Sequence, residues 1–109
     1  MRVLVTGVSG FVGGHVVDML RREQPGAEVV GLDSRPGNRA RALGIEVLPA
    51  DLQDAAAVRH ALDRVRPQRV VHLAAQSSPQ RSWEDPAGTL KTNLLGLLHL
   101  LEGARTLAL

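Results

Sequence analysis

Three regularly spaced glycines, Gly7, Gly10 and Gly13, are the residues of this sequence best suited to binding a ligand. They follow an apolar run at residues 2–6 and precede residues 11–22, where apolar side chains recur at helical spacing. A glycine turn between a strand and a helix presents backbone N–H groups and the positive end of the helix dipole to an anion. Such glycines can also serve turn geometry alone, but the strand–turn–helix context favours the pyrophosphate of a dinucleotide.

An acidic residue lies at a position suited to binding a ribose. Asp33 comes twenty positions after Gly13, at the end of a second apolar run over residues 28–33. A carboxylate there accepts hydrogen bonds from ribose hydroxyls and repels a 2′-phosphate, which favours NAD over NADP. It could instead cap a turn. Arg35, and more weakly Arg39, could pair with a 2′-phosphate and permit NADP, or could be solvated loop charges.

The elements that must position these residues alternate along the chain. Strands are predicted at residues 2–6, 28–33, 45–51 and 69–75. Helices are predicted at residues 11–22, at 39–43, from an N-cap at Asp54 to Val65, and from Asp85 and Pro86 almost to the terminus, with a polar loop over 77–83. This alternation predicts an α/β fold, a Rossmann-type doubly wound parallel sheet of about four strands in the order 3-2-1-4 with flanking helices.

The composition is that of one globular domain over residues 1–109. The chain is 44% hydrophobic and 22% charged with a net charge of +2, and its basic and acidic residues are interspersed, which argues against nucleic-acid binding. It has no cysteine, which excludes disulfides and thiolate metal sites, and we expect no metal site. It has neither a signal-peptide pattern nor a membrane-spanning apolar run, so we expect a cytoplasmic location and no membrane partner.

Four segments of the sequence resemble, in order, the motifs of one known family. These are "TGVSGFVG" (residues 6–13, a TGxxGxxG fingerprint), "ADLQD" (50–54, a DLxD segment), "HLAAQSS" (72–78, an xxAA segment) and "TNLLGLLHLLEGAR" (92–105, the following helix). The family is the extended short-chain dehydrogenases/reductases, or NAD-dependent epimerase/dehydratase family. The resemblance covers essentially the whole chain and is finer for the GDP-sugar branch, GDP-4-dehydro-6-deoxymannose reductases and GDP-mannose 4,6-dehydratases. It implies the N-terminal, NAD(P)-binding part of a nucleotide-sugar oxidoreductase or dehydratase.

The resemblance also implies which residues meet the cofactor. The Asp51 side chain and the Leu52 backbone would contact adenine, although Asp51 could instead cap a helix. Residues 73–75 would line the cofactor, although the two alanines could be small because a helix packs over them. Ser77 is expected where family members begin to contact the sugar-nucleotide substrate, although a loop serine is polar for many reasons. The complete set expected at the cofactor is Gly7, Gly10, Phe11, Val12, Gly13, Asp33, Arg35, Asp51, Leu52, Leu73, Ala74, Ala75 and Gln76.

Structural roles are expected for several other residues that could do chemistry. His72 is interpreted as a hydrogen-bonded core histidine, Trp83 as packing against the last helix, and Asn93 as fastening that helix to a neighbouring strand. His60 and His99 lie on helical patterns and need no function.

The family's catalytic Tyr-x-x-x-Lys pair and Ser or Thr have no counterpart in this sequence. The chain contains no tyrosine, and its single lysine, Lys91, lies in a different segment, so we assign no catalytic residue. We expect an incomplete domain that lacks the catalytic and substrate-binding part and does not turn over substrate by itself. A free-standing dinucleotide-binding or self-associating module is the alternative.

The last helix is predicted to be apolar nearly all round, so it must be buried from several sides. In the resembled family this helix contributes to a dimer. A fifth strand would pair with the fourth in the full fold, and without it residues 69–73 would form an exposed apolar edge strand. The partners we expect are therefore a dinucleotide, a second copy of the chain through the C-terminal helix, and a sugar nucleotide only when the substrate-binding part is supplied.

Overall fold

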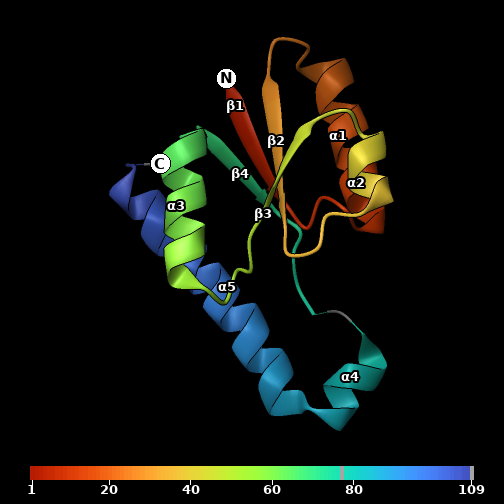
Figure 1. The fold of residues 1–109 in the computed structure, drawn as a ribbon, viewed down its shortest axis with the longest axis vertical. Coiled ribbons are helices and arrows are strands. Elements are labelled where there is room, and N and C mark those ends of the chain that lie inside the picture. The colour runs from red at the N-terminus through yellow and green to blue at the C-terminus, as the bar shows by residue number, and fades with distance from the viewer. Residues whose placement is uncertain (77, 109) are drawn as a thin grey trace.

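The chain folds into a parallel sheet whose four strands lie in the order β3-β2-β1-β4, with helices on both faces (Figure 1). This computed structural model describes residues 1–76 and 78–108. The strands are β1 (Arg2–Thr6), β2 (Glu28–Asp33), β3 (Glu46–Pro49) and β4 (Arg69–His72), and the helices are α1 (Phe11–Glu23), α2 (Asn38–Ala42), α3 (Ala55–Val65), α4 (Pro79–Glu84) and α5 (Pro86–Thr106). The predicted fold class and strand order are confirmed.

The central strand β1 contributes to two apolar cores, one on each face of the sheet. Val3 and Val5 are buried on one face with Val17 of α1. Leu4 is buried on the other face with Leu62 of α3. Because successive strand side chains point to opposite faces, the all-apolar run in β1 is what a strand covered on both sides requires. Helix α5 joins the second core and packs on α3.

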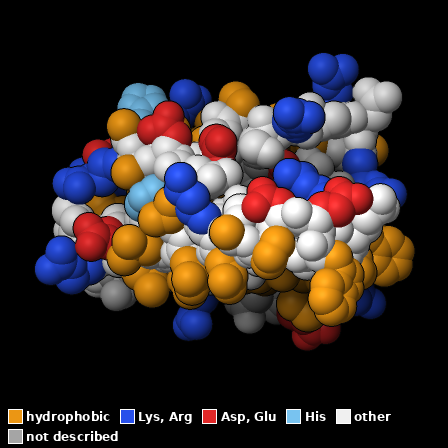
Figure 2. Space-filling view, turned by 90° about the horizontal axis from the view of Figure 1, so that it is seen from below, with side chains coloured by type: hydrophobic (Ala, Val, Ile, Leu, Met, Phe, Trp, Pro, Cys, Tyr) orange, Lys and Arg blue, Asp and Glu red, His pale blue; other side chains and the backbone are white. Residues whose placement is uncertain are grey.

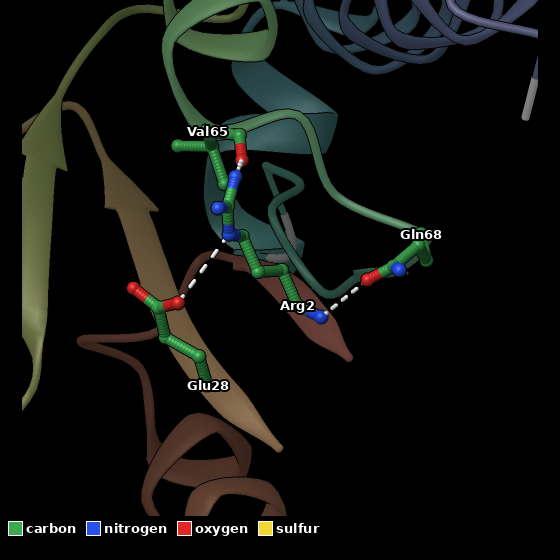
Figure 3. A network of polar contacts seen from close by, with 4 residues as sticks. All are labelled: Arg2, Glu28, Val65 and Gln68. Atoms are coloured by element: carbon green, nitrogen blue, oxygen red, sulfur yellow. Dashed lines mark hydrogen bonds and ion pairs between the residues drawn. The ribbon is translucent and has the colours of Figure 1, made fainter.

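Arg2 fastens neighbouring segments at the amino-terminal end of the sheet (Figure 3). Its guanidinium donates to the Val65 carbonyl oxygen at 2.9 Å and pairs with Glu28 at 3.3 Å, while its backbone N–H donates to Gln68 Oε1 at 2.6 Å. Exposed ion pairs contribute little stability, so the main effect of these contacts is on geometry. They hold β1 against β2 and against the turn that leads into β4.

The two predicted helix N-caps are confirmed, and the segment after β4 differs from expectation. Asp54 accepts the Ala57 N–H at 3.2 Å, and Asp85 accepts the Gly88 N–H at 3.0 Å. The predicted polar loop contains helix α4 instead, because a cap at Ser78 and a proline at the first position start a helix there. Trp83 on this helix is 87% exposed, so its predicted packing against the last helix was wrong.

Two predicted strands are longer than the observed ones. Strand β4 ends at His72 instead of residue 75, because the Leu73 N–H is shared between the Thr6 carbonyl oxygen and Thr6 Oγ1, and the Ala74 N–H then bonds to Thr6 Oγ1. Strand β3 is shorter than predicted at both ends, and it stops at Pro49, which has no N–H to donate. Among the described residues, no helix is both long enough and apolar enough to cross a membrane.

A buried threonine joins the carboxyl ends of β1 and β4. Thr6 Oγ1 accepts the N–H groups of Leu73 at 3.1 Å and Ala74 at 3.2 Å, and lies 2.7 Å from His72 Nδ1. Because both lone pairs of the hydroxyl are occupied, its O–H donates to Nδ1, which therefore carries no proton. Burial lowers the pKa of His72 and favours the same neutral ring. His72 thus has the structural role predicted for it.

Replacing Gly13 by alanine should destabilise the fold, because an added Cβ would lie 2.6 Å from the carbonyl carbon of Val8. Gly14, the next residue of α1, is the matched control, because its added Cβ would meet only Leu43 Cδ2 at 3.7 Å. In urea unfolding we expect Gly13→Ala to lose about 2 kcal/mol, typical of overpacking. Gly14→Ala should gain up to about 1 kcal/mol from helix propensity. Equal stability of the two variants would contradict the close packing of the glycine turn.

The free energy of unfolding should fall as the pH drops through the ordinary histidine pKa of 6.5, partly because of His72. Burial lowers the pKa of folded His72, so the unfolded chain binds the proton more readily, and the stabilisation present above this pH is lost below it. His72→Asn keeps an oxygen that accepts the Thr6 hydroxyl but cannot titrate. Unfolding curves at about pH 7.5 and about pH 5.5 should therefore differ less for the variant. An unchanged pH dependence would show that the ring does not contribute.

Candidate functional site

A cleft of about 630 Å³ lies at the carboxyl end of the parallel strands. Its wall is formed by the glycine loop after β1, the segments that follow β2, β3 and β4, and residues of α4 and α5. All carboxyl ends of a parallel sheet lie at one edge, so distant segments meet there. The lining includes the predicted residues Gly7, Gly10, Phe11, Val12, Gly13, Asp33, Asp51, Leu52, Leu73, Ala74, Ala75 and Gln76.

Two sequence-predicted residues are not among those that line the cleft. Arg35 is exposed and absent from the lining, and Arg39, the weaker candidate for a 2′-phosphate, is also exposed on α2. The backbone N–H of Arg35 points back to Asp33 Oδ1 at 3.4 Å. Ser77, the predicted substrate residue, lies outside the described residues.

The glycine loop forms a tight turn that crosses directly in front of the segment after β4. Gly7 has φ +66°, and a Cβ on it would lie 2.7 Å from the backbone nitrogen of Ala74. A side chain is therefore excluded both by the left-handed backbone and by the neighbouring chain. No side chain of the described residues caps α1, and its first turn carries no acidic residue. The free N–H groups of that turn make this end of the cleft favourable for an anion.

Asp33 is held beside the glycine loop. Its Oδ2 accepts the Ser9 N–H at 3.0 Å, so the carboxylate at the end of β2 is tied to the turn after β1. Part of the carboxylate remains available, because the second contact, to Arg35, is long. Ser9 Oγ is buried and finds no hydrogen-bond partner within the described part of the chain. The arrangement combines an oriented carboxylate with an unpaired hydroxyl at one wall of the cleft.

The segment after β3 forms a turn whose own hydrogen bonds use Asp51. Asp51 Oδ1 accepts the Gln53 N–H at 2.9 Å, and its carbonyl oxygen accepts the Asp54 N–H at 2.9 Å. Since Asp54 caps α3, the possibility that Asp51 caps this helix is not realised. Leu52, at the corner of the turn, reaches both the cleft and the core packed around α3.

Gln76 holds the wall formed by α4 and α5. Its Nε2 donates to Thr89 Oγ1 at 2.9 Å and to Ser82 Oγ at 3.3 Å. Its backbone N–H donates to Asn93 Oδ1 at 2.7 Å, and Asn93 Nδ2 donates back to the Gln76 carbonyl at 3.2 Å. The side-chain amide of Gln76 is thus engaged within the protein, which supports the wall. Asn93 fastens α5 as predicted, although to the segment after β4 and not to the strand itself.

Sequence reasoning missed several lining residues, and it had a usable signal for only some of them. Five of them lie inside the motifs that were recognised, namely Ser9, Ala50, Gln53, Thr92 and Gly96. The helix start at Ser78 and Pro79 would have placed Arg81 on α4. The other missed residues, Leu32 and Ser34, flank Asp33 and line the cleft because folding brings the end of β2 to it. Among the described lining residues Arg81 is the one cation, opposite in charge to Asp33 and Asp51.

Comparisons with known proteins agree with this geometry. The model of the "NAD dependent epimerase/dehydratase family" matches residues 3–109. UDP-glucose 4-epimerase of Mycolicibacterium smegmatis is 39% identical over 96% of this chain and 35% of its own length. UDP-glucuronate 4-epimerase 1 of Arabidopsis thaliana is 40% identical over 92% of this chain and 25% of its own length. The chain thus spans about a third or less of these curated relatives.

A solved structure shares the fold closely. UDP-glucose 4-epimerase of Thermus thermophilus, crystallised in complex with NAD, superposes with a TM-score of 0.87 and is 41% identical over 99% of this chain and 35% of that chain. The order of the strands, the glycine turn and the match over almost every residue all lead to the same assignment. The chain therefore belongs to the NAD dependent epimerase/dehydratase family.

Proposed function

We propose that this chain is the NAD-binding part of a nucleotide-sugar oxidoreductase, dehydratase or epimerase. The observation that carries the proposal is the cleft at the sheet edge, where the glycine loop, Asp33, the turn at residues 51–54 and the segment at residues 73–75 meet. Relatives of the chain are nucleotide-sugar 4-epimerases, and the related Thermus thermophilus epimerase binds NAD.

The residues of the cleft fit a dinucleotide along its length. The uncapped first turn of α1, entered through Gly10, would hold the pyrophosphate, and Asp33 would accept hydrogen bonds from the adenosine ribose. Asp51 and Leu52 would contact the adenine, and residues 73–75 would line the remainder. When bound, NAD supplies a nicotinamide that accepts and returns hydride. The protein's own contribution is binding and orientation.

The cleft favours NAD over NADP. Asp33 places a negative charge where a 2′-phosphate would lie, and its hydrogen bond from Ser9 keeps it oriented. A basic side chain that could neutralise this phosphate is needed for NADP, and Arg35 does not line the described part of the cleft.

The sugar-nucleotide class is the proposed substrate of the whole protein. The sequence resemblance points to a GDP-sugar, that of a GDP-6-deoxymannose reductase or dehydratase, whereas the relatives described above are named for UDP-sugars. The identity of the base therefore depends on residues of the substrate-binding part. Ser77 remains our proposed first substrate contact within these residues.

We propose that the 109 residues bind the cofactor without turning over substrate. A general acid or base must lie within hydrogen-bond reach of the reacting hydroxyl, and the family's tyrosine has no counterpart here, since the chain contains none. The alternative is a free-standing dinucleotide-binding or self-associating module. It would also not turn over substrate, and it differs only in biological role.

Self-association through α5 is the second part of the proposal. Five leucines of this helix are exposed, and Figure 2 shows hydrophobic side chains in a row along one side of the end where α4 and α5 lie. These residues are Leu90, Leu94, Leu97, Leu98 and Leu101. The opposite side of α5 is packed against α3, where Gly103 lets it approach Leu62. An apolar face of this kind is typical of a protein–protein contact.

The chain should bind NADH, and Asp33 should favour NADH over NADPH. Asp33→Asn removes the charge but keeps an oxygen that accepts the Ser9 N–H, so the loop is retained. NADH affinity should fall roughly tenfold or more, because hydrogen bonds to charged groups contribute about 1.5–3 kcal/mol. NADPH affinity should fall less or rise. Titration followed by nicotinamide fluorescence measures both constants.

The control for this prediction is Asp18→Asn, an exposed carboxylate on α1 that does not line the cleft. It should leave both affinities unchanged. If the unmodified chain binds no NADH at millimolar concentration, the proposed function is wrong. If Asp33→Asn and Asp18→Asn behave alike, Asp33 does not contact the ribose.

Sedimentation at micromolar concentration should show a dimer or higher oligomer that a charge on α5 dissociates. Leu94→Glu places a carboxylate on the exposed leucine face, where Leu94 is 62% exposed, so the buried charge would oppose association. Met19→Glu changes an exposed apolar residue of α1 in the same way and should have no effect. A stable monomer of the unmodified chain would refute self-association.

A further inference from the structure

We propose that His99 of α5 is a positioning residue for the adenine side of the cleft, holding the Leu52 backbone where it can contact the base. The proposal rests on the proposed function, because it assigns a role toward the dinucleotide to a residue that the sequence did not connect with binding. It joins two segments 47 residues apart in sequence, the turn after β3 and the fourth turn of α5.

The contact is a single short hydrogen bond. His99 Nδ1 lies 2.6 Å from the Leu52 carbonyl oxygen, and both groups are partly buried. A carbonyl oxygen can only accept, so Nδ1 carries the proton and donates it.

Helix α5 approaches the segment after β3 closely enough for this bond because Gly96 lies about one helical turn before His99. A Cβ on Gly96 would lie 3.2 Å from Leu52 Cβ, so the helix backbone faces the leucine directly. Gly96 and Leu52 both line the cleft. Leu52 is thus held by packing on Gly96 and by a directed bond from His99, while its own turn is closed by the two contacts to Asp51.

Holding the carbonyl of Leu52 defines the direction of the peptide that follows it. The side of the turn that faces the cleft is then preorganised, so binding of the dinucleotide loses less conformational entropy there. Loss of the donor would leave a partly buried carbonyl without its partner and release the corner of the turn. We therefore expect loss of the donor to weaken the affinity for the adenine half of the dinucleotide.

The test compares two substitutions that both retain an N–H donor. In His99→Asn the donor Nδ2 is attached to Cγ, as Nδ1 is in histidine, so the bond to Leu52 is reproduced. In His99→Gln the donor lies one bond further from the backbone and overshoots the carbonyl. His60→Gln, an exposed position of α3, is the control for the chemical change. Affinities for NADH and for ADP-ribose are measured on the full chain by calorimetry.

We expect His99→Gln to weaken both NADH and ADP-ribose roughly five- to tenfold, the effect of one hydrogen bond. His99→Asn and His60→Gln should stay within about twofold of the unmodified chain. Nicotinamide mononucleotide, which lacks the adenosine half, should bind with unchanged affinity in every variant. Equal affinities for His99→Asn and His99→Gln, whether both normal or both weak, would overturn the proposal.

A ligand-free measurement separates this proposal from the proposed function. Hydrogen exchange of the Gln53 and Asp54 amides reports the order of the turn, because both donate within it. Exchange should be faster in His99→Gln and normal in His99→Asn. If the unmodified chain binds no NADH, the proposed function fails while the exchange rates still test the contact. Unchanged exchange in His99→Gln would show that the bond does not position the turn.

Discussion

The close approach of two backbones at the carboxyl end of β1 is the constraint on which the site depends. Thr6 receives the N–H groups of Leu73 and Ala74 on its hydroxyl, and Gly7 then turns directly in front of the Ala74 backbone. Any side chain at Gly7 would separate the two strands, and loss of the hydroxyl would remove the acceptor of the partly buried Ala74 N–H. The cleft exists because these chains diverge immediately beyond this junction.

The other walls follow from the same junction. Helix α1 covers one face of the sheet and α3 covers the other (Figure 1). Strands β2 and β3 lie on the side of β1 away from β4, so the segments that follow them form the other side of the cleft. Each wall has its own fastening: Ser9 to Asp33, Gln76 to Asn93, and His99 to Leu52. These bonds connect segments that are far apart in the sequence, so directed polar contacts help to set the shape of the cleft.

Much of the fold and most of the candidate site could be predicted from the sequence, because their signals are local. The glycine spacing, the caps at Asp54 and Asp85, and the apolar run of β1 act within a few residues, and the structure has each of them as predicted. The errors lie where local signals were weak or misjudged. Helix α4 is only six residues long, and its polar side chains resembled a loop. Trp83 was expected to pack against α5, but its short helix leaves it exposed.

The sequence by itself determined the strand order and the set of motifs that reach the sheet edge, because periodicity and glycine spacing are properties of neighbouring residues. The resemblance of those motifs then indicated the family. Only the tertiary structure decided what the polar side chains do. The neutral ring of His72, the internal use of the Gln76 amide, the position of Arg35 outside the described lining of the cleft and the bond from His99 to Leu52 depend on partners brought together by folding. A hydrogen bond requires a distance and a direction between two groups, and a one-dimensional pattern specifies neither for residues far apart in the chain.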